Sequence, residues 1–427
     1  MKVNAKKRSN QQKEIFSMGI KLGLVGLGSF GRAFAPLFAN HPLVDSIGLC
    51  DLEEERIRWV WDDPRIKAKV DPKCVTQSLD EMCASDCDAL VVITQPWLHA
   101  PQCIKAMEHG KDVYSAVPVQ CIPDDDEVLD WCGKIIETVR RTGKEYMLGE
   151  TTIYRPQTMF CKRMAAQNLF GNFVYAAAEY AHDVDWITCS LREVAKSRST
   201  GKAGQERAAI MQKYFDRGLK NHPFSYPTHS VSGVVEVMRS KPVKVCAFGQ
   251  KNTNNDPHFA NSDFSNMTAL FQMENGAAFR VSEMREICDG LGLRGEDFRI
   301  FGTRGSYSYA QWQNNGRVEP TPEPKAVELK ELTDEEMRDP LPPEVAAAFK
   351  KVMQPDAKEG DDFVPQGHGG SHPYLVHEFC SAVAEHRRPA ISAWDAAMYM
   401  AMGVAAHKSA QKDGELVKVE DFGKVWN

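Results

Sequence analysis

The sequence has no C-x-x-C pair, no apolar run of membrane-spanning length and no long block of like charge. Its twelve cysteines are scattered, and some, such as Cys50 and Cys246, lie within apolar runs where a free thiol behaves as a small hydrophobic group. This distribution favours buried thiols in a reducing compartment over a disulfide framework. We therefore expect a cytoplasmic protein with no secretory signal and no membrane partner.

Charges of both signs are mixed along the chain, with 52 Lys and Arg against 58 Asp and Glu and a net charge of −6. This balance argues against a protein that binds nucleic acid through its phosphates. With 427 residues, of which 43% are hydrophobic, the chain is long enough for two or three domains and a cleft of substrate size. A small binding module and a disordered chain are thereby excluded.

The pattern of apolar runs changes near residue 150. Before it, uninterrupted apolar strands alternate with helices, which is typical of a parallel sheet covered on both faces. After it, alternating strands such as 267–273 and 277–284 predict an antiparallel sheet with helices on one face. We predict an α/β fold followed by an α+β fold, divided into a flexible extension (1–19), a Rossmann dinucleotide-binding domain (20–150) and an α+β substrate-binding domain (151–427).

A glycine-rich turn follows the first expected strand. Gly26, Gly28 and Gly31 form a G-x-G-x-x-G pattern before a helix, the arrangement in which a pyrophosphate meets a helix N-terminus. Asp51 ends the second strand at the spacing from which a carboxylate binds the adenine ribose, and its charge favours NAD over NADP. A glycine-rich turn without a ligand is the alternative. The expected cofactor residues are Gly26, Gly28, Ser29, Phe30, Gly31 and Asp51.

Further cofactor contacts are expected beyond the carboxyl ends of the later strands, where ligands of such sheets lie. Thr94, Gln95 and His99 follow one of these strands, and Pro118 follows the next. Trp97 lies in the same segment, where it would either stack on a sugar or cover the nicotinamide.

The order of these motifs resembles the Gfo/Idh/MocA family of oxidoreductases from Lys21 to about Val417. The likeness rests on the dinucleotide fingerprint, on TQPWLH at 94–99 and on GTRGS at 302–306. It implies a nicotinamide cofactor, a sugar substrate and a homo-oligomer formed through the open face of the C-terminal sheet. The catalytic turn of that family reads Glu-Lys-Pro, whereas this chain has Ala-Val-Pro at 116–118. Val117 cannot assist proton transfer as that lysine does.

Three other segments resemble one branch of this family, the NAD-dependent alpha-N-acetylgalactosaminidases. Tyr226 and His229 match its Tyr-x-x-His pair, Tyr154 matches its active-site tyrosine, and 367–370 match its Gly-His-Gly-Gly. The resemblance implies a cycle in which a sugar hydroxyl is oxidised, the glycosidic bond is eliminated and the sugar is reduced again. The branch has a glutamate at the position of Ala116, so the match is incomplete there.

The catalytic candidates are His229, Tyr154 and Tyr226. Because imidazole titrates near neutrality, we expect His229 to act as an acid or base, and the alternative is a buried histidine at a helix start. Tyr226 either shares a proton with it or packs as an aromatic side chain. The substrate-binding candidates are His368, as the polar tip of a glycine-rich loop, and His182, Arg155 and Trp97. The alternatives are a solvated strand end for His182 and a surface arginine for Arg155.

We expect no metal site. His368 and His372 have the spacing of two ligands on a helix, but the glycines around His368 break a helix at that point. No histidine lies near the pair Cys83 and Cys87 to complete a zinc site.

Three functions follow from these patterns. The first is an NAD(P)-dependent oxidoreductase of carbohydrate metabolism that transfers a hydride from a sugar or glycoside hydroxyl to nicotinamide. The second is an NAD-dependent glycosidase with an internal cycle of oxidation, elimination and reduction. The third is a cofactor-binding protein without turnover, because the family's usual lysine is absent.

Overall fold

The computed structural model describes residues 19–187, 190–289, 295–317, 323 and 326–423. The predicted N-terminal extension, 1–19, lies outside this part of the chain except for Gly19, and so does Cys189. The described residues form two compact units. Unit 1 takes its residues from Met1–Gln120, Trp131–Tyr154 and Pro340–Ala393, and unit 2 from Cys121–Asp130, Arg155–Asp339 and Trp394–Asn427.

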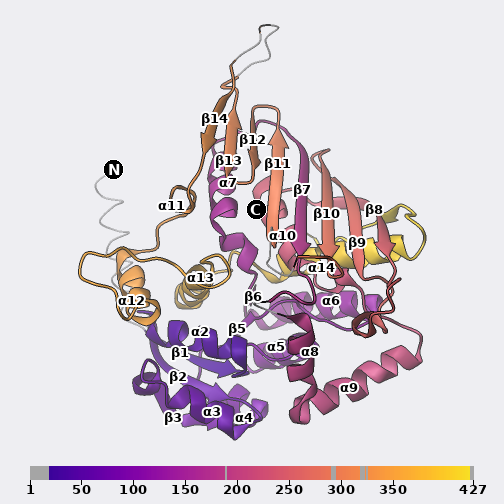
Figure 1. Ribbon diagram of the computed structural model, residues 1–427. Coiled ribbons are helices and arrows are strands. Elements are labelled where there is room, and N and C mark those ends of the chain that lie inside the picture. Colours follow the sequence, from indigo (N-terminus) through magenta and orange to yellow (C-terminus); the bar gives the residue numbers. More distant parts are fainter. Residues whose placement is uncertain (1–18, 188–189, 290–294, 318–322, 324–325, 424–427) are drawn as a thin grey trace. The chain divides into compact units, whose positions relative to one another are not determined.

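Unit 1 contains a six-stranded parallel sheet in the order β3-β2-β1-β4-β5-β6 (Figure 1). All four residues of its strand β4 are buried, as expected for a parallel sheet covered by helices. The strand order reverses between β1 and β4, the point at which such sheets bind their ligands. The strands are β1 (Ile20–Val25), β2 (Val44–Cys50), β3 (Val70–Thr76), β4 (Ala89–Val92), β5 (Asp112–Ser115) and β6 (Tyr146–Leu148).

Helices connect these strands. The segment from Pro340 adds two helices that pack against α2. Helix α6 begins with three acidic residues and ends with two arginines, which complements its dipole, and its first turns up to Asp130 belong to unit 2. The helices are α2 (Ser29–Asn40), α3 (Glu54–Trp61), η1 (Lys67–Lys69), α4 (Leu79–Ala84), α5 (His99–Glu108), α6 (Asp125–Thr142), η2 (Thr151–Tyr154), α12 (Pro343–Met353) and α13 (His372–Glu385).

Unit 2 contains a nine-stranded sheet in the order β14-β13-β12-β11-β7-β10-β9-β8-β15. Its neighbouring strands are antiparallel except for β7 and β10, which are parallel. Every second residue of β9 is buried, the period expected when one face is covered. The strands are β7 (Phe173–Ala181), β8 (Pro242–Gln250), β9 (Asn266–Met273), β10 (Ala278–Met284), β11 (Glu296–Gly302), β12 (Gly305–Ser308), β13 (Gln311–Asn314), β14 (Glu328–Glu331) and β15 (Val417–Lys418).

Helix α10 is the central helix of unit 2. It packs against β7, β10, β11 and helix α7, and every one of its residues is buried. The helices of unit 2 are α7 (Pro156–Ala166), α8 (Leu191–Ser199), α9 (Gly201–Asp216), η3 (Pro223–Ser225), α10 (Thr228–Met238), η4 (Pro257–Phe259), α11 (Asp334–Met337) and α14 (Ala393–Ala410).

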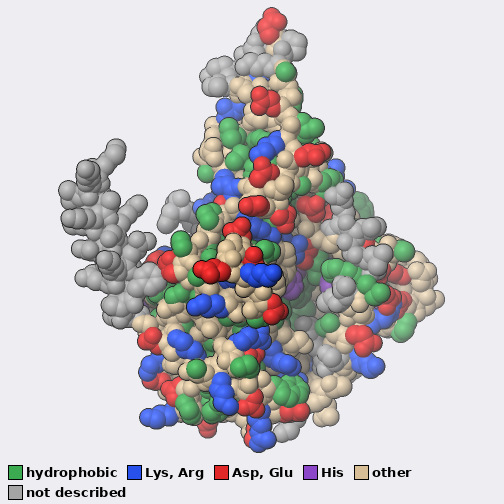
Figure 2. All heavy atoms as spheres, turned by 60° about the vertical axis from the view of Figure 1, so that its left-hand side comes forward, with side chains coloured by type: hydrophobic (Ala, Val, Ile, Leu, Met, Phe, Trp, Pro, Cys, Tyr) green, Lys and Arg blue, Asp and Glu red, His purple; other side chains and the backbone are tan. Residues whose placement is uncertain are grey.

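The predicted fold class is confirmed: a Rossmann-type parallel sheet precedes a mostly antiparallel one. The apolar pattern does not reveal β3, because Asp71, Pro72 and Lys73 interrupt it and are not buried. Within the described part of the chain all cysteines are free thiols, and the sulfur atoms of Cys74 and Cys87 lie 3.4 Å apart. None of the described helices combines the length and the hydropathy needed to cross a membrane. On the face in Figure 2, basic and acidic side chains are interspersed.

Candidate functional site

The dinucleotide loop of unit 1, which we define as Gly26–Gly31, has the geometry that its glycines predict. Gly26 has a φ of 90°, a conformation that residues with a Cβ rarely adopt. A Cβ on Gly31 would overlap the carbonyl oxygen of Gly26, so α2 packs directly against the turn. Nothing lies within 4 Å of the Cβ position of Gly28. Open space beside the first residues of α2, Ser29 and Phe30, fits a pyrophosphate, which needs room and backbone N–H donors.

Asp51 ties the second strand to this loop. Its Oδ2 accepts a hydrogen bond of 2.7 Å from the backbone N–H of Leu27, and its Oδ1 accepts one of 3.0 Å from Glu53. This places the carboxylate beside the loop at the end of β2, where a ribose would bind. The guanidinium of Arg56 lies 3.8 Å from Oδ1, so a positive charge is also present at this edge. The preference for NAD over NADP therefore stays a prediction.

His99 connects the loop after β4 with the loop after β5, the two further segments that we expect to contact the cofactor. The buried ring places Nδ1 2.8 Å from the carbonyl oxygen of Pro118 and Nε2 3.2 Å from that of Thr94. The peptide between Val117 and Pro118 is cis. His99 thus holds the turn that contains Val117 next to the loop after β4.

Trp97 and Gln95 lie in the same loop after β4. The indole N–H of Trp97 donates to Gln95 Oε1 at 3.2 Å, and the carbonyl oxygen of Trp97 accepts a hydrogen bond from Gln120 at 2.8 Å. The loop is therefore fixed by its own side chains. The predicted roles of Trp97 and Gln95 in ligand binding stay predictions.

The loop at 367–370 lies beside the dinucleotide loop within unit 1. The ring of His368 contacts Phe30 edge-on at 5.5 Å between centroids, and its Nδ1 lies 2.8 Å from Nε2 of His372. All four residues of the loop have positive φ, 81°, 43°, 68° and 84°, which explains why three of them are glycine. The structure therefore brings the predicted substrate residue His368 to the predicted cofactor residue Phe30, and adds His372 to them.

Tyr154, the third catalytic candidate, also belongs to unit 1. It ends η2, is half-buried and stacks on Tyr374 of α13 with ring centroids 6.2 Å apart. Tyr374 follows His372 by two residues on the same helix, so the loop at 367–370 and Tyr154 are held by the same element.

Several polar side chains of unit 2 lie together at one end of its sheet. Strands β7 and β10 run parallel and end together, and β11, antiparallel to β7, begins at that end. The first turn of α10 reaches the same place, because the rings of His229 and Tyr180 lie 5.1 Å apart. We define the strand-end cluster as Tyr180, His182, Tyr226, His229, Glu283, Arg285 and Glu296.

His229 is buried at the centre of the strand-end cluster. Its ring lies 5.4 Å from that of Tyr226, and its Nδ1 lies 3.9 Å from Oε2 of Glu296. The predicted pair of Tyr226 and His229 is thus in contact. The predicted substrate residue His182 joins through Tyr180, whose hydroxyl lies 2.7 Å from His182 Nδ1.

The strand-end cluster also contains a buried carboxylate, that of Glu283. Glu283 is fully buried, accepts a hydrogen bond from the Ser230 hydroxyl and pairs with Arg285 at 2.6 Å. Burial raises the pKa of Glu283 to about 7, although Arg285, Ser230 and His229 act in the opposite direction. Burial and the nearby Glu296 also raise the pKa of Tyr180 well above its ordinary value. Glu283 therefore exchanges protons near neutral pH, whereas Tyr180 stays protonated.

Arg155 is occupied by another member of the strand-end cluster. Its guanidinium forms an ion pair of 2.6 Å with the half-buried Glu296 and donates to the carbonyl oxygen of the same residue at 3.3 Å. This contact fixes Glu296 beside His229. The role of Arg155 as a substrate ligand stays a prediction, because its charge is used within the protein.

Sequence reasoning missed Tyr180, Glu283, Arg285 and Glu296, and it considered His372, in unit 1, only as a metal ligand. Glu283 and Arg285 do give a signal, since two charges flank Met284 at the end of an apolar strand. Their meeting with His229 depends on the order of strands in the sheet, which the sequence pattern does not supply. The resulting set of acid, base and phenol groups can exchange protons with a bound hydroxyl.

Comparison with known proteins agrees with the geometry of unit 1. Residues 20–149 match the family described as "Oxidoreductase family, NAD-binding Rossmann fold" (GFO_IDH_MocA). Residues 20–149 are thus similar to the Rossmann domain of that family. This match agrees with the resemblance predicted from the motifs over these residues, and the description of the family supports a nicotinamide cofactor.

Two relatives of this chain have names of glycoside hydrolases. A glycosyl hydrolase family 109 protein of Shewanella pealeana is 27% identical over 224 residues, 51% of this chain and 44% of that protein. An alpha-N-acetylgalactosaminidase of Shewanella oneidensis is 26% identical over 223 residues, with the same coverage. The match thus spans less than half the length of these relatives.

A solved structure extends the likeness in fold to nearly the whole chain. Levoglucosan dehydrogenase, in complex with NADH and L-sorbose, has a TM-score of 0.69 at 16% identity and covers 95% of this chain and 100% of its own. The likeness in fold therefore includes unit 2 as well as the Rossmann sheet.

Proposed function

We propose that the chain oxidises a hydroxyl group of a sugar or glycoside with a bound nicotinamide cofactor. The observation that carries the proposal is the strand-end cluster, in which His229 contacts Tyr226 and Tyr180 and lies 3.9 Å from a carboxylate. Such a group suits the removal of a proton from a hydroxyl. Support also comes from levoglucosan dehydrogenase, whose name states a sugar substrate.

The dinucleotide loop and Asp51 would hold the cofactor, because the open space at Gly28 and the free N-terminus of α2 fit a pyrophosphate. When bound, a nicotinamide accepts a hydride from the carbon that carries the hydroxyl. His229 takes the proton of that hydroxyl, the role that a valine at 117 cannot fill. Glu283 has a pKa of about 7, so it can accept this proton or return it. The proton then stays within the buried cluster.

A second candidate is a glycosidase whose nicotinamide is regenerated in each turnover. It is supported by the relatives named glycosyl hydrolase family 109 and alpha-N-acetylgalactosaminidase. Both functions begin with removal of a proton from a sugar hydroxyl, so the same residues serve both. They differ in whether reduced cofactor accumulates and whether a glycosidic bond is cleaved.

One assay separates these candidates. Purified full-length protein is mixed with a panel of aryl glycosides and free sugars, in the presence of NAD or NADP, and both reduced nicotinamide and released aryl alcohol are followed. Reduced cofactor without cleavage supports the oxidoreductase. Cleavage without net reduction supports the glycosidase. Binding of the cofactor with neither product over the whole panel would overturn both and leave a cofactor-binding protein.

The residue assignment has its own test. His229→Ala should lower kcat/KM by about 10²–10⁴-fold, the usual contribution of a general base, while cofactor affinity is unchanged. The matched control is His109→Ala, because His109 is an exposed histidine outside both groups of residues. An unchanged kcat/KM in the His229 variant would remove this residue from the mechanism.

A further inference from the structure

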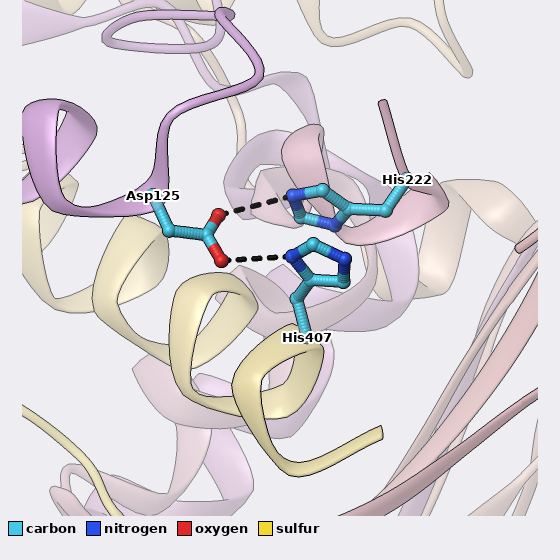
Figure 3. A group of neighbouring side chains, drawn as sticks. All are labelled: Asp125, His222 and His407. Atoms are coloured by element: carbon cyan, nitrogen blue, oxygen red, sulfur yellow. Dashed lines mark hydrogen bonds and ion pairs between the residues drawn. The ribbon is translucent and has the colours of Figure 1, made fainter. Parts of the chain in front are cut away.

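Three side chains of unit 2, two buried histidines and one half-buried aspartate, meet at a place that the proposed function does not use (Figure 3). Asp125 opens helix α6, His222 precedes the short helix η3, and His407 lies near the end of α14. His222 and His407 are 5% and 2% exposed. In the sequence Asp125 is 97 residues from His222 and 282 from His407. Residues so far apart form no sequence motif from which the group could be predicted.

The distances bring one donor atom of each side chain together. His222 Nε2 lies 3.2 Å from Asp125 Oδ1, and His407 Nδ1 lies 2.8 Å from Asp125 Oδ2. All three donor atoms lie within 4.8 Å of one another. Two imidazoles and a carboxylate are a common ligand set for zinc and neighbouring divalent metals.

A fourth residue holds His407 in the way that metal-binding histidines are held. Oδ2 of Asp263 lies 3.2 Å from His407 Nε2, the ring nitrogen that does not face Asp125. The same oxygen accepts a hydrogen bond of 2.8 Å from Gln411, and Lys220 lies 3.9 Å from the other oxygen. An outer carboxylate on the second nitrogen orients a metal-ligating imidazole and raises its basicity.

The charges of the group also favour a cation. Asp125 and Asp263 place two carboxylates around two imidazoles that are almost completely buried. Both carboxylates are half-buried, and a carboxylate that is partly removed from water is stabilised by a compensating positive charge. One divalent ion balances both carboxylates while both imidazoles stay neutral.

The two imidazole rings are stacked, with centroids 3.6 Å apart and planes 5° apart. A single ion cannot lie in both ring planes, so one ring must turn about its Cβ–Cγ bond when the ion binds. That torsion is soft in histidine. The ring of His222 can turn without losing a hydrogen bond at Nδ1, because this atom makes none within the described structure.

We propose that Asp125, His222 and His407 bind a divalent transition-metal ion, with Zn²⁺ as the probe and Asp263 as the outer carboxylate. The ion would join three segments of unit 2 that are distant in the sequence. Among them is the segment from His222 to Thr228, which leads through Tyr226 into α10 and His229. The site is therefore structural, and it stabilises the chain that carries the strand-end cluster.

The test uses untagged full-length protein, stripped with a chelator and titrated with Zn²⁺. We expect one equivalent of Zn²⁺ per chain by calorimetry, a rise in Tm on binding, and with Co²⁺ the visible absorption of a four-coordinate site. Metal analysis of the protein as purified then reports which ion it carries. If stripped protein binds no stoichiometric Zn²⁺ or Co²⁺ and its Tm does not change, the proposal is wrong and the group is a hydrogen-bonded ion network.

Variants give a graded control. Asp125→Asn and His222→Gln keep the approximate shape of the side chain but remove a ligand, so each should abolish stoichiometric binding. Asp263→Asn removes only the outer carboxylate and should weaken binding by about 10–100-fold. His258→Gln, at a half-buried histidine of the same unit that lies outside the group, should bind like the unaltered protein. Equal binding by all four variants would place the ion elsewhere, and the titration of the unaltered protein decides the question even if a variant fails to fold.

Discussion

In the dinucleotide loop the functional groups are backbone N–H groups within a single stretch, Gly26–Gly31, whereas the strand-end cluster takes side chains from β7, β10, β11 and α10. The loop depends on the absence of side chains, since a Cβ would collide at Gly26 and Gly31. The cluster depends on charges that compensate one another in a buried place. The two regions should therefore fail in different ways when they are changed.

The largest effect is expected from removing a charge of the strand-end cluster. Glu283→Ala leaves the buried guanidinium of Arg285 without the carboxylate that lies 2.6 Å from it. Loss of one partner of a buried pair costs about 3–5 kcal/mol of the free energy of unfolding. Denaturation with urea, followed by tryptophan fluorescence, measures it. Glu283→Gln, which keeps a hydrogen-bond acceptor, is the matched control, and equal losses in both variants would show that the charge pair contributes little.

A pH series tests how the protonation of Glu283 affects the stability of the protein. Because Glu283 has a folded-state pKa of about 7 against an ordinary 4.5, the unfolded chain ionises first as pH rises. This group's contribution to stability is complete below pH 4.5 and is lost as pH rises through 7, a change of about 3 kcal/mol. The stability of the unaltered protein relative to Glu283→Gln should fall across this window. A difference that is flat with pH would mean that Glu283 is ionised throughout.

A pair of glycine substitutions tests the dinucleotide loop. Gly31→Ala forces a Cβ against the carbonyl oxygen of Gly26 and should cost about 1–3 kcal/mol of stability. Gly28→Ala meets nothing within 4 Å, so its stability should change by less than about 0.5 kcal/mol. The added methyl group instead occupies the space for the pyrophosphate, and calorimetry should show NAD binding at least about tenfold weaker. Unchanged NAD affinity in Gly28→Ala would place the cofactor elsewhere.

The difference between the two regions also explains what the sequence could predict. The dinucleotide loop is local: a strand, three glycines and an acid at fixed spacing define it, and the structure has Asp51 bonded to the loop as that spacing predicts. Tyr226 and His229 are also local, three residues apart, and their rings are in contact. These parts could be predicted because neighbours in the sequence are neighbours in space.

The remaining parts depend on the pairing of distant strands. Glu283 and Glu296 reach His229 only because β7 pairs with β10 on one side and β11 on the other. An apolar pattern predicts that these strands exist but not their order, and here the parallel pairing of β7 and β10 breaks the antiparallel pattern that we expected. The group of Asp125, His222 and His407 is missed for the same reason.

The smallest effect on the stability of one chain is expected at the open face of the unit 2 sheet, which we predict to form a homo-oligomer. Leu270 and Phe248 are 46% and 65% exposed, and they share one face, because Leu270 pairs with Cys246 and Phe248 with Thr268. Leu270→Lys should reduce the molar mass measured by light scattering while changing the stability of the chain by less than about 0.5 kcal/mol. Gln205→Lys adds the same charge at an exposed polar position of helix α9, outside this sheet, and should leave the mass unchanged. If Leu270→Lys does not alter the mass either, this face is not the interface of an oligomer.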